Sequence, residues 1–66
     1  MNSNIKFSLQ EKKILQYLSQ AKSRKTIAQE LQISVNTVDT HLRNIRTKTN
    51  THSIPEILVW SIKNNS

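Results

Sequence analysis

The sequence predicts an all-α domain of four helices. Its 66 residues contain no Gly and a single Pro, and its apolar residues recur at helical spacing between short polar breaks. A chain of this length forms one domain, near the lower limit for folding without a metal or a disulfide. We divide it into a flexible segment at 1–6, a helical domain at 7–63 and a polar tail at 64–66.

The first helix is expected to begin after Ser8 and to end between Ser19 and Ala21. Ser8 and Glu11 have the spacing of a capping box, in which the serine hydroxyl accepts an N–H and the glutamate reaches back to the cap. Phe7 is expected to join the core from just before the cap. The residues expected to face inward from this helix are Leu9, Ile14, Leu15 and Leu18.

The second and third helices are separated by a short break. Ser23 is the expected cap of a helix at 24–31, and Ser34 is the expected cap of a helix at 35–49. Ile33, in the break, is expected to pack under the turn. The residues expected to face inward are Ile27, Ala28 and Leu31 from the second helix, and Val38, Leu42, Ile45 and Thr49 from the third.

The fourth helix is expected at 54–63. Ser53 and Glu56 form a second capping box, and Pro55 is tolerated because the first turn needs no N–H from it. This helix is apolar on nearly all sides, and its Trp60 is interpreted as a packing residue. In so small a domain only one face can meet the core, so the rest needs a cover. A second copy of the domain is the favoured cover, and another domain of a longer chain is the alternative.

Positive charge is concentrated in the middle of the chain. The net charge is +6, and between positions 22 and 48 six basic residues face only Glu30 and Asp39, which leaves +4 in that segment. Such a field attracts polyanions, chiefly nucleic acid. The six basic residues are Lys22, Arg24, Lys25, Arg43, Arg46 and Lys48.

The third helix is predicted to read DNA bases. On a helical wheel of this segment, the side opposite the apolar stripe carries Asn36, Thr40, Arg43 and Thr47. Asp39, Asn44 and Arg46 lie on its flanks. In a major groove Arg can bind guanine, Asn adenine and Asp the cytosine amino group, while Thr offers a methyl or a hydroxyl. A merely solvated helix face would more often carry Glu and Lys pairs at this spacing.

The segment from Phe7 to Leu58 resembles the LuxR/GerE-type helix-turn-helix family. The resemblance rests on Ser8-x-x-Glu11 and on an ungapped series of positions: Ile27-Ala28-x-x-Leu31-x-Ile33-Ser34-x-x-Thr37-Val38-x-x-His41-x-x-Asn44-Ile45-x-x-Lys48. It implies a four-helix DNA-binding domain of a bacterial transcription regulator, usually dimeric through the fourth helix. Double-stranded DNA and a second copy are the expected partners, and RNA polymerase is the partner to test for a sigma-factor-like region. The absence of Cys and of any long apolar run favours the cytoplasm.

The resemblance also implies roles for individual residues. Its base-edge positions match Asp39, Thr40 and Arg43, to which the helical wheel adds Asn36 and Thr47. The expected contacts to the DNA backbone are Ser23, Lys25, Thr37, Asn44, Arg46 and Lys48. The expected dimer interface consists of Ile54, Ile57, Leu58, Ser61 and Ile62.

Four positions depart from the family pattern. Asp39 stands where the family often has Lys or Arg, so it either reads a cytosine amino group or lowers affinity. Thr49-Asn50 replaces Leu-Gly, and Asn can adopt the left-handed conformation that Gly supplies. Thr49 is expected to weaken the seam between the third and fourth helices. Ile54 replaces a residue that is often basic, which removes a phosphate contact or shifts the interface.

Other function classes are less compatible with the sequence. It has no glycine loop for phosphates, no nucleophile with a nearby base and no Cys, so we expect neither an enzyme nor a cofactor or metal site. His41 is interpreted as a packed histidine, and His52 as an exposed one that could meet a phosphate. A promoter-reading region of a sigma factor and a protein-interaction module built on the last helix remain as alternatives. A membrane-surface role is weaker, because basic and apolar residues lie on different helices.

Overall fold

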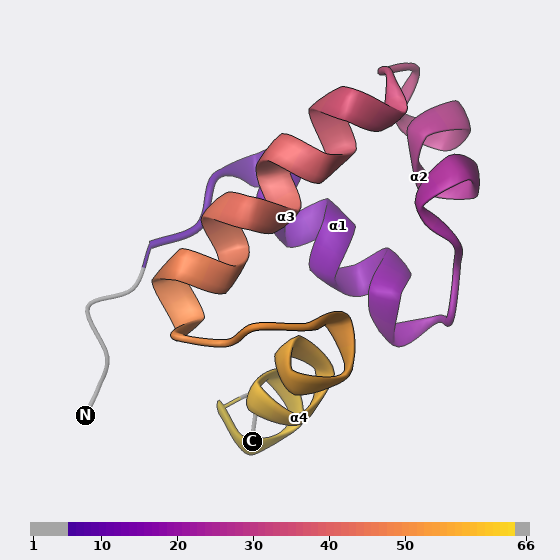
Figure 1. The fold of residues 1–66 in the computed structure, drawn as a ribbon. Helices are drawn as coiled ribbons and strands as arrows, with labels where there is room; N and C mark the ends of the chain where they lie inside the picture. The colour runs from indigo at the N-terminus through magenta and orange to yellow at the C-terminus, as the bar shows by residue number, and fades with distance from the viewer. Residues whose placement is uncertain (1–5, 65–66) are drawn as a thin grey trace.

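The computed structural model describes residues 6–64, which form four helices. They are α1 (Leu9–Ser19), α2 (Arg24–Leu31), α3 (Val35–Thr49) and α4 (Ile54–Asn64). Figure 1 shows α3 crossing α1, with α2 beside the beginning of α3 and α4 below its end. The predicted all-α, four-helix fold is confirmed, and α4 extends one residue beyond the predicted end. Residues 1–5 of the predicted flexible segment and 65–66 of the predicted tail lie outside the described residues.

Each helix begins at a serine that accepts a backbone N–H from the residue three positions later. The hydroxyls of Ser8, Ser23 and Ser34 accept at 3.1, 3.1 and 3.0 Å, and that of Ser53 accepts at 3.3 Å. At α1 the capping box is complete, because the Ser8 N–H donates to Oε1 of Glu11 at 2.9 Å. These bonds satisfy N–H groups that the first turn of a helix leaves unpaired.

The capping box predicted for α4 forms with a shift of one residue. The Glu56 N–H donates to the Ser53 hydroxyl as expected, but the Glu56 carboxylate accepts from the N–H of His52, at 2.8 Å, instead of that of Ser53. This arrangement fixes the turn between α3 and α4 from both sides.

The first three helices end at residues in the left-handed conformation, although none of these residues is Gly. Ala21, Gln32 and Asn50 have φ of 63°, 59° and 56°. In each turn the following N–H donates to the carbonyl five residues earlier, at 2.9 to 3.1 Å, as in a Schellman motif. The prediction for Asn50 is confirmed. Ala21 and Gln32 carry no sequence signal for this conformation, because residues of their kind disfavour it.

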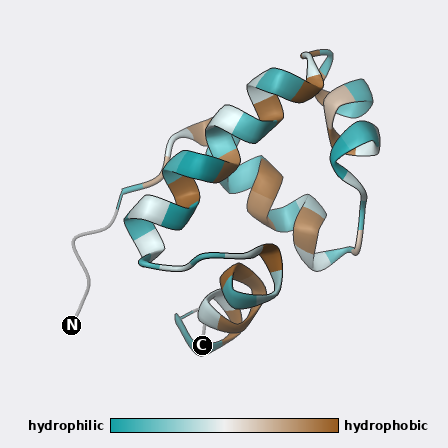
Figure 2. Ribbon diagram, viewed as in Figure 1, coloured by the Kyte–Doolittle hydropathy of each residue, from teal (hydrophilic) through white to brown (hydrophobic). Residues whose placement is uncertain are grey.

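The core lies where the four helices meet. Figure 2 shows the hydrophobic residues on the inner sides of the helices and along much of α4. All four predicted inward residues of α3 are buried, and Phe7, Leu15, Leu31 and Ile33 are partly buried against the core. Its buried members are Ile14, Leu18, Ile27, Ala28, Val38, Leu42, Ile45 and Ile57.

The inward face of α1 differs from the prediction at its first turn. Leu9, expected in the core, is 70% exposed, whereas Glu11 is only 3% exposed. Leu9 precedes Ile14 by five positions, which places it about 140° away around the helix, while Glu11 shares the face of Ile14 and Leu18. In the first turn of α1, Glu11 therefore lies in the core where Leu9 was predicted.

Thr49 is buried at the seam between α3 and α4, and its hydroxyl has hydrogen-bond partners. Its Oγ1 donates to the carbonyl of Ile45, and Oγ1 of Thr51 lies within hydrogen-bonding distance; both separations are 2.8 Å. A buried hydroxyl with partners costs much less than an orphaned one. The seam thus holds a small polar cluster where an apolar side chain would pack.

Candidate nucleic-acid interface

The outer face of α3 presents a row of exposed polar side chains. Because Val38, Leu42 and Ile45 are buried, the residues on the far side of the helix point away from the core. Asn36, Thr40, Arg43 and Thr47 form this row, which we call the reading row, and all four are exposed. The structure thus brings together four of the five predicted base-reading residues at the spacing of successive helical turns.

The two threonines of the reading row use their hydroxyl hydrogens within the helix. Thr40 donates to the carbonyl of Asn36 at 3.1 Å, and Thr47 donates to the carbonyl of Arg43 at 3.0 Å. Each threonine can therefore present its methyl group and an acceptor oxygen to a ligand, but not a donor. A methyl group suits contact with thymine, so hydrogen-bond donation from this row falls to Asn36 and Arg43.

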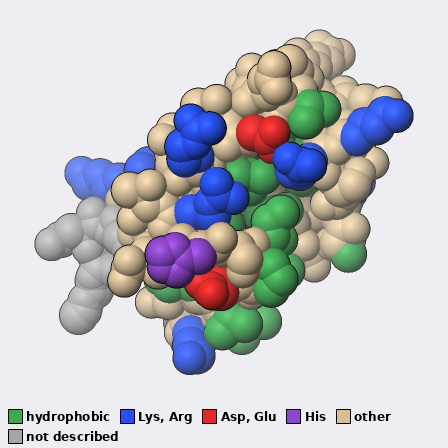
Figure 3. Space-filling view, viewed as in Figure 1, with side chains coloured by type: hydrophobic (Ala, Val, Ile, Leu, Met, Phe, Trp, Pro, Cys, Tyr) green, Lys and Arg blue, Asp and Glu red, His purple; other side chains and the backbone are tan. Residues whose placement is uncertain are grey.

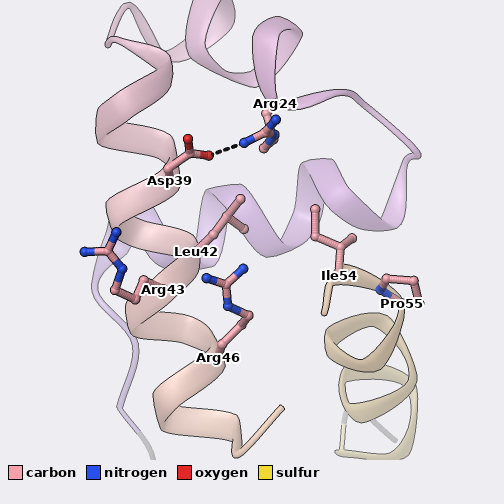
Figure 4. Close-up of a pocket in the computed structure, with 7 residues that line it drawn as sticks. All are labelled: Arg24, Asp39, Leu42, Arg43, Arg46, Ile54 and Pro55. Atoms are coloured by element: carbon pink, nitrogen blue, oxygen red, sulfur yellow. Dashed lines mark hydrogen bonds and ion pairs between the residues drawn. The ribbon is translucent and has the colours of Figure 1, made fainter. Parts of the chain in front are cut away.

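Asp39, the fifth predicted base-reading residue, forms an ion pair in this structure. Its Oδ1 accepts from the guanidinium of Arg24, the first residue of α2, at 2.7 Å (Figure 4). Arg24 was not among the predicted site residues. The two residues are fifteen positions apart, and only the packing of α2 on α3 brings them together.

A hollow beside the reading row collects basic side chains. Arg24, Arg43 and Arg46 line it, and Asp39 is the one acidic residue among its lining residues. Figure 4 shows Leu42 between α3 and α4, with Ile54 and Pro55 at the α4 side. In Figure 3 the Lys and Arg side chains spread over this face, with hydrophobic side chains exposed between them. Guanidinium groups around an apolar floor form a surface suited to an anion.

Lys48 lies on the opposite flank of α3 and belongs to the fold. Its ammonium contacts Oε1 of Glu11 at 2.6 Å and the carbonyl of Lys6 at 3.0 Å, and lies 5.6 Å from the centre of the Phe7 ring. Two of the three N–H donors of the ammonium are thus used within the domain, and the Phe7 ring adds a cation–π contact. Lys48, a predicted phosphate contact, therefore also links α3 to the start of α1. Lys6, expected in the flexible segment, is held by the same contact.

The carboxylate of Glu11 is held in its charged form. Burial raises the pKa of Glu11, but the hydrogen bonds from Lys48 and the Ser8 N–H, with the positive charges of Lys48 and His41, outweigh burial and lower it. The net direction is downward from the ordinary value of 4.5. The carboxylate therefore links the start of α1 to the last turn of α3.

The remaining predicted backbone contacts come from the start of α2 and from α3. Lys25 and Asn44 are exposed, and Arg46 is half-buried at the hollow. Thr37, also exposed, donates its N–H to the cap of α3, and Ser23 is itself the cap of α2. Two of these six positions thus also fix the ends of the helices that form the site.

The two histidines and the acidic residues form no metal site. His41 is half-buried near Glu11, and His52 is exposed in the turn before α4. Within residues 6–64 no three His, Asp or Glu side chains gather closely enough to hold a metal ion.

The predicted dimer surface on α4 needs correction. Ile57 is fully buried, and Ile54 and Leu58 pack partly against the core, because this side of α4 closes the domain. Ile62 is exposed as expected, and Ser61 is partly exposed. Val59, which the prediction omitted, is exposed three positions before Ile62, on the same side of the helix. We call Val59 and Ile62 the α4 apolar patch.

Trp60 packs inside the domain, as predicted. Its ring meets that of Phe7 edge to face, with centroids 5.7 Å apart and planes at 78°. This contact joins α4 to the residues that precede α1. Trp60 is therefore a packing residue, and bases would have to be recognised elsewhere.

Comparison with known proteins identifies the family. The GerE family, described as bacterial regulatory proteins, luxR family, matches residues 6–61. Neither the curated proteins nor the solved structures gave a significant match. Among the described helices none is long and apolar enough to cross a membrane. The match covers α1, α2, α3 and most of α4, and the chain belongs to the luxR family of bacterial regulatory proteins, carrying the DNA-binding helix-turn-helix domain of a transcription regulator.

Proposed function

We propose that the domain binds double-stranded DNA with sequence preference by placing α3 in the major groove. The observation that supports this best is the reading row, whose Asn36 and Arg43 side chains are exposed on a helix whose other side is buried. A major groove admits one α-helix and offers acceptors to Arg and a mixed edge to Asn. The basic hollow, which Arg43 of the row also lines, lies where the phosphates would run, and Lys25 of α2 is exposed.

Selection of binding sites from random DNA, followed by titration of the selected site, tests this proposal. Arg43→Ala should lose about 1–3 kcal/mol of discrimination at one base position, because a bidentate contact to guanine is removed. Lys12→Ala, which removes a positive charge from the groove between α1 and α4, is the matched control and should retain the preference. An unchanged preference in Arg43→Ala would overturn the proposed orientation of α3.

We propose that two copies act together through the α4 apolar patch. A regulator that binds a two-fold site needs two reading helices about 34 Å apart, which a symmetric dimer provides. Sedimentation of the wild type and of Ile62→Glu measures this. The wild type should be dimeric on DNA, and the variant should remain folded but bind only half-sites.

The same patch supports a second candidate, a module that binds another protein while the basic face plays no part. The two candidates predict different results for Arg43→Ala combined with Arg46→Ala. Loss of DNA binding with the self-association intact fits the regulator. Tight binding of another protein by this double variant, with no DNA binding by the wild type, fits the interaction module. As a regulator of chromosomal genes the chain would act in the cytoplasm and carry out no catalysis.

A further inference from the structure

The ion pair between Arg24 and Asp39 lies at the edge of the basic hollow. It joins the first residue of α2 to the second turn of α3, and both side chains are substantially exposed. One guanidinium nitrogen of Arg24 bonds the carboxylate. A guanidinium carries five N–H donors, so this single bond leaves most of its capacity unused.

Asp39 is the sole acidic side chain among the residues that line the hollow. Its negative charge lies beside Arg24, near Arg43 and Arg46, on the side where the proposed function places DNA (Figure 4). An anion that binds in the hollow therefore competes with the Asp39 carboxylate for the arginine side chains. Since Arg24 is the arginine bonded to Asp39, it is the one whose availability Asp39 controls.

We propose that Arg24 is a further DNA-phosphate-binding residue and that Asp39 competes with the phosphate for it. Asp39 then sets the general affinity of the domain and does not read a base. This inference rests on the proposed function. It changes the role of two residues: Arg24 joins the contact surface, and Asp39 leaves the set of base readers.

The exchange is feasible because the pair is exposed. An ion pair in contact with water is weak, whereas a guanidinium can bind a phosphate through two parallel hydrogen bonds. The carboxylate that Arg24 leaves behind can be hydrated, because the Asp39 side chain is 38% exposed, so separating the pair costs little. The Lys48 pair differs, because the Glu11 side chain is only 4% exposed, so separating that pair leaves a charge at a buried position.

The first experiment is Asp39→Asn in the full chain, titrated with the selected site and with unrelated DNA over a range of salt. In the wild type Asp39 and the phosphate share Arg24, so removing the carboxylate adds at most one phosphate contact and steepens the slope of log K against log salt by up to about 0.9. The affinity of the variant relative to wild type should then grow by up to about threefold between roughly 200 and 50 mM salt, equally on both DNAs. Site selection with Asp39→Asn should return the wild-type sequence.

Glu30→Gln is the matched control. It also removes one carboxylate from an exposed ion pair, with Lys22 at 2.8 Å, but away from the hollow. Its salt slope should equal that of the wild type. A slope that steepens equally in Glu30→Gln and Asp39→Asn would show a general charge effect and overturn the inference.

The decisive arm repeats Asp39→Asn in an Arg24→Gln background. If Asp39 acts through Arg24, Asp39→Asn leaves the slope of log K against log salt unchanged in the Arg24→Gln background. An equal steepening with and without Arg24 would show plain repulsion between Asp39 and DNA, and a changed base at any position of the selected site would show that Asp39 is a reader. Either result overturns the inference while the proposed function stands. Absence of any sequence preference in the wild type overturns the proposed function itself.

Discussion

The two ion pairs that attach α3 to its neighbours have nearly the same length but different surroundings. Lys48 bonds Glu11 of α1 at 2.6 Å, and Asp39 bonds Arg24 of α2 at 2.7 Å. The Glu11 side chain is 4% exposed and that of Lys48 35%, whereas the Arg24 and Asp39 side chains are 52% and 38% exposed. A buried charge cannot be left without a partner, but an exposed one can exchange its partner for water or a phosphate. Burial, and not distance, therefore separates a structural pair from an exchangeable one.

Breaking the buried pair should have the largest effect. Lys48→Met leaves the Glu11 carboxylate buried with little besides the Ser8 N–H, so we expect a loss of about 2–3 kcal/mol in the free energy of unfolding. Urea denaturation measures this. Adding Glu11→Gln to Lys48→Met should recover part of the loss, because no unpaired charge remains. A loss equal to that of the exposed Lys12→Met would contradict the structural role of Lys48.

The second-largest effect is expected from acid, which should weaken the same Glu11–Lys48 pair. The pKa of Glu11 is lowered in the folded state, so the unfolded chain binds more protons as the pH falls through this range. The stability that Glu11 contributes is therefore present above about pH 4.5 and is lost as the pH falls toward its folded-state pKa. Unfolding measured against pH should show a gap between wild type and Glu11→Gln that closes in acid. A constant gap at all pH values would contradict this.

The turns at the two ends of α3 allow a smaller comparison that does not involve charge. Gln32 and Asn50 are both left-handed, but Asn tolerates this conformation better. Gln32→Gly should therefore raise the free energy of unfolding by roughly 0.5–1 kcal/mol, and Asn50→Gly should change it little. Thermal unfolding of the two variants measures the difference. Equal effects would show that the side chains, and not the backbone, decide these turns.

The smallest effect is expected for the exposed pair. Arg24→Gln should change the free energy of unfolding by less than about 0.5 kcal/mol, and salt should remove even that difference. Urea denaturation at low and high salt checks it. A loss above about 1 kcal/mol would make the Arg24–Asp39 pair structural and would remove the basis for its exchange with a phosphate.

Most of the fold could be predicted from the sequence because its signals are local. Serine caps and apolar residues at helical spacing act within one or two turns, and they predicted the first three helices as the structure has them. Leu9 shows where this fails, since a residue in the first turn can match the apolar pattern loosely and still lie outside the packed face. The left-handed Ala21 was missed because its conformation is imposed by packing and not by its own preference.

The candidate site was less predictable because it depends on contacts between helices. The outer row of α3 follows from its inner stripe, so Asn36, Thr40 and Arg43 could be identified from the sequence. The partners of Asp39 and Lys48 could not, since Arg24 and Glu11 are fifteen and thirty-seven positions away. A charged residue on the outside of a helix looks the same in sequence whether it meets DNA or another helix.

One carboxylate oxygen of Glu11 links the start of α1 to the last turn of α3, and this link bears on local unfolding at that end of the domain. Its Oε1 accepts from the Ser8 N–H, which lies ahead of α1, and from Lys48 in the last turn of α3. An amide at the edge of a domain normally exchanges its hydrogen with solvent quickly, through local fraying. Because Lys48 helps to hold this carboxylate in place, loss of the Lys48 contact should speed the exchange of the Ser8 amide. Comparing this exchange rate in the wild type and in Lys48→Met therefore reports how strongly the start of α1 is coupled to the last turn of α3.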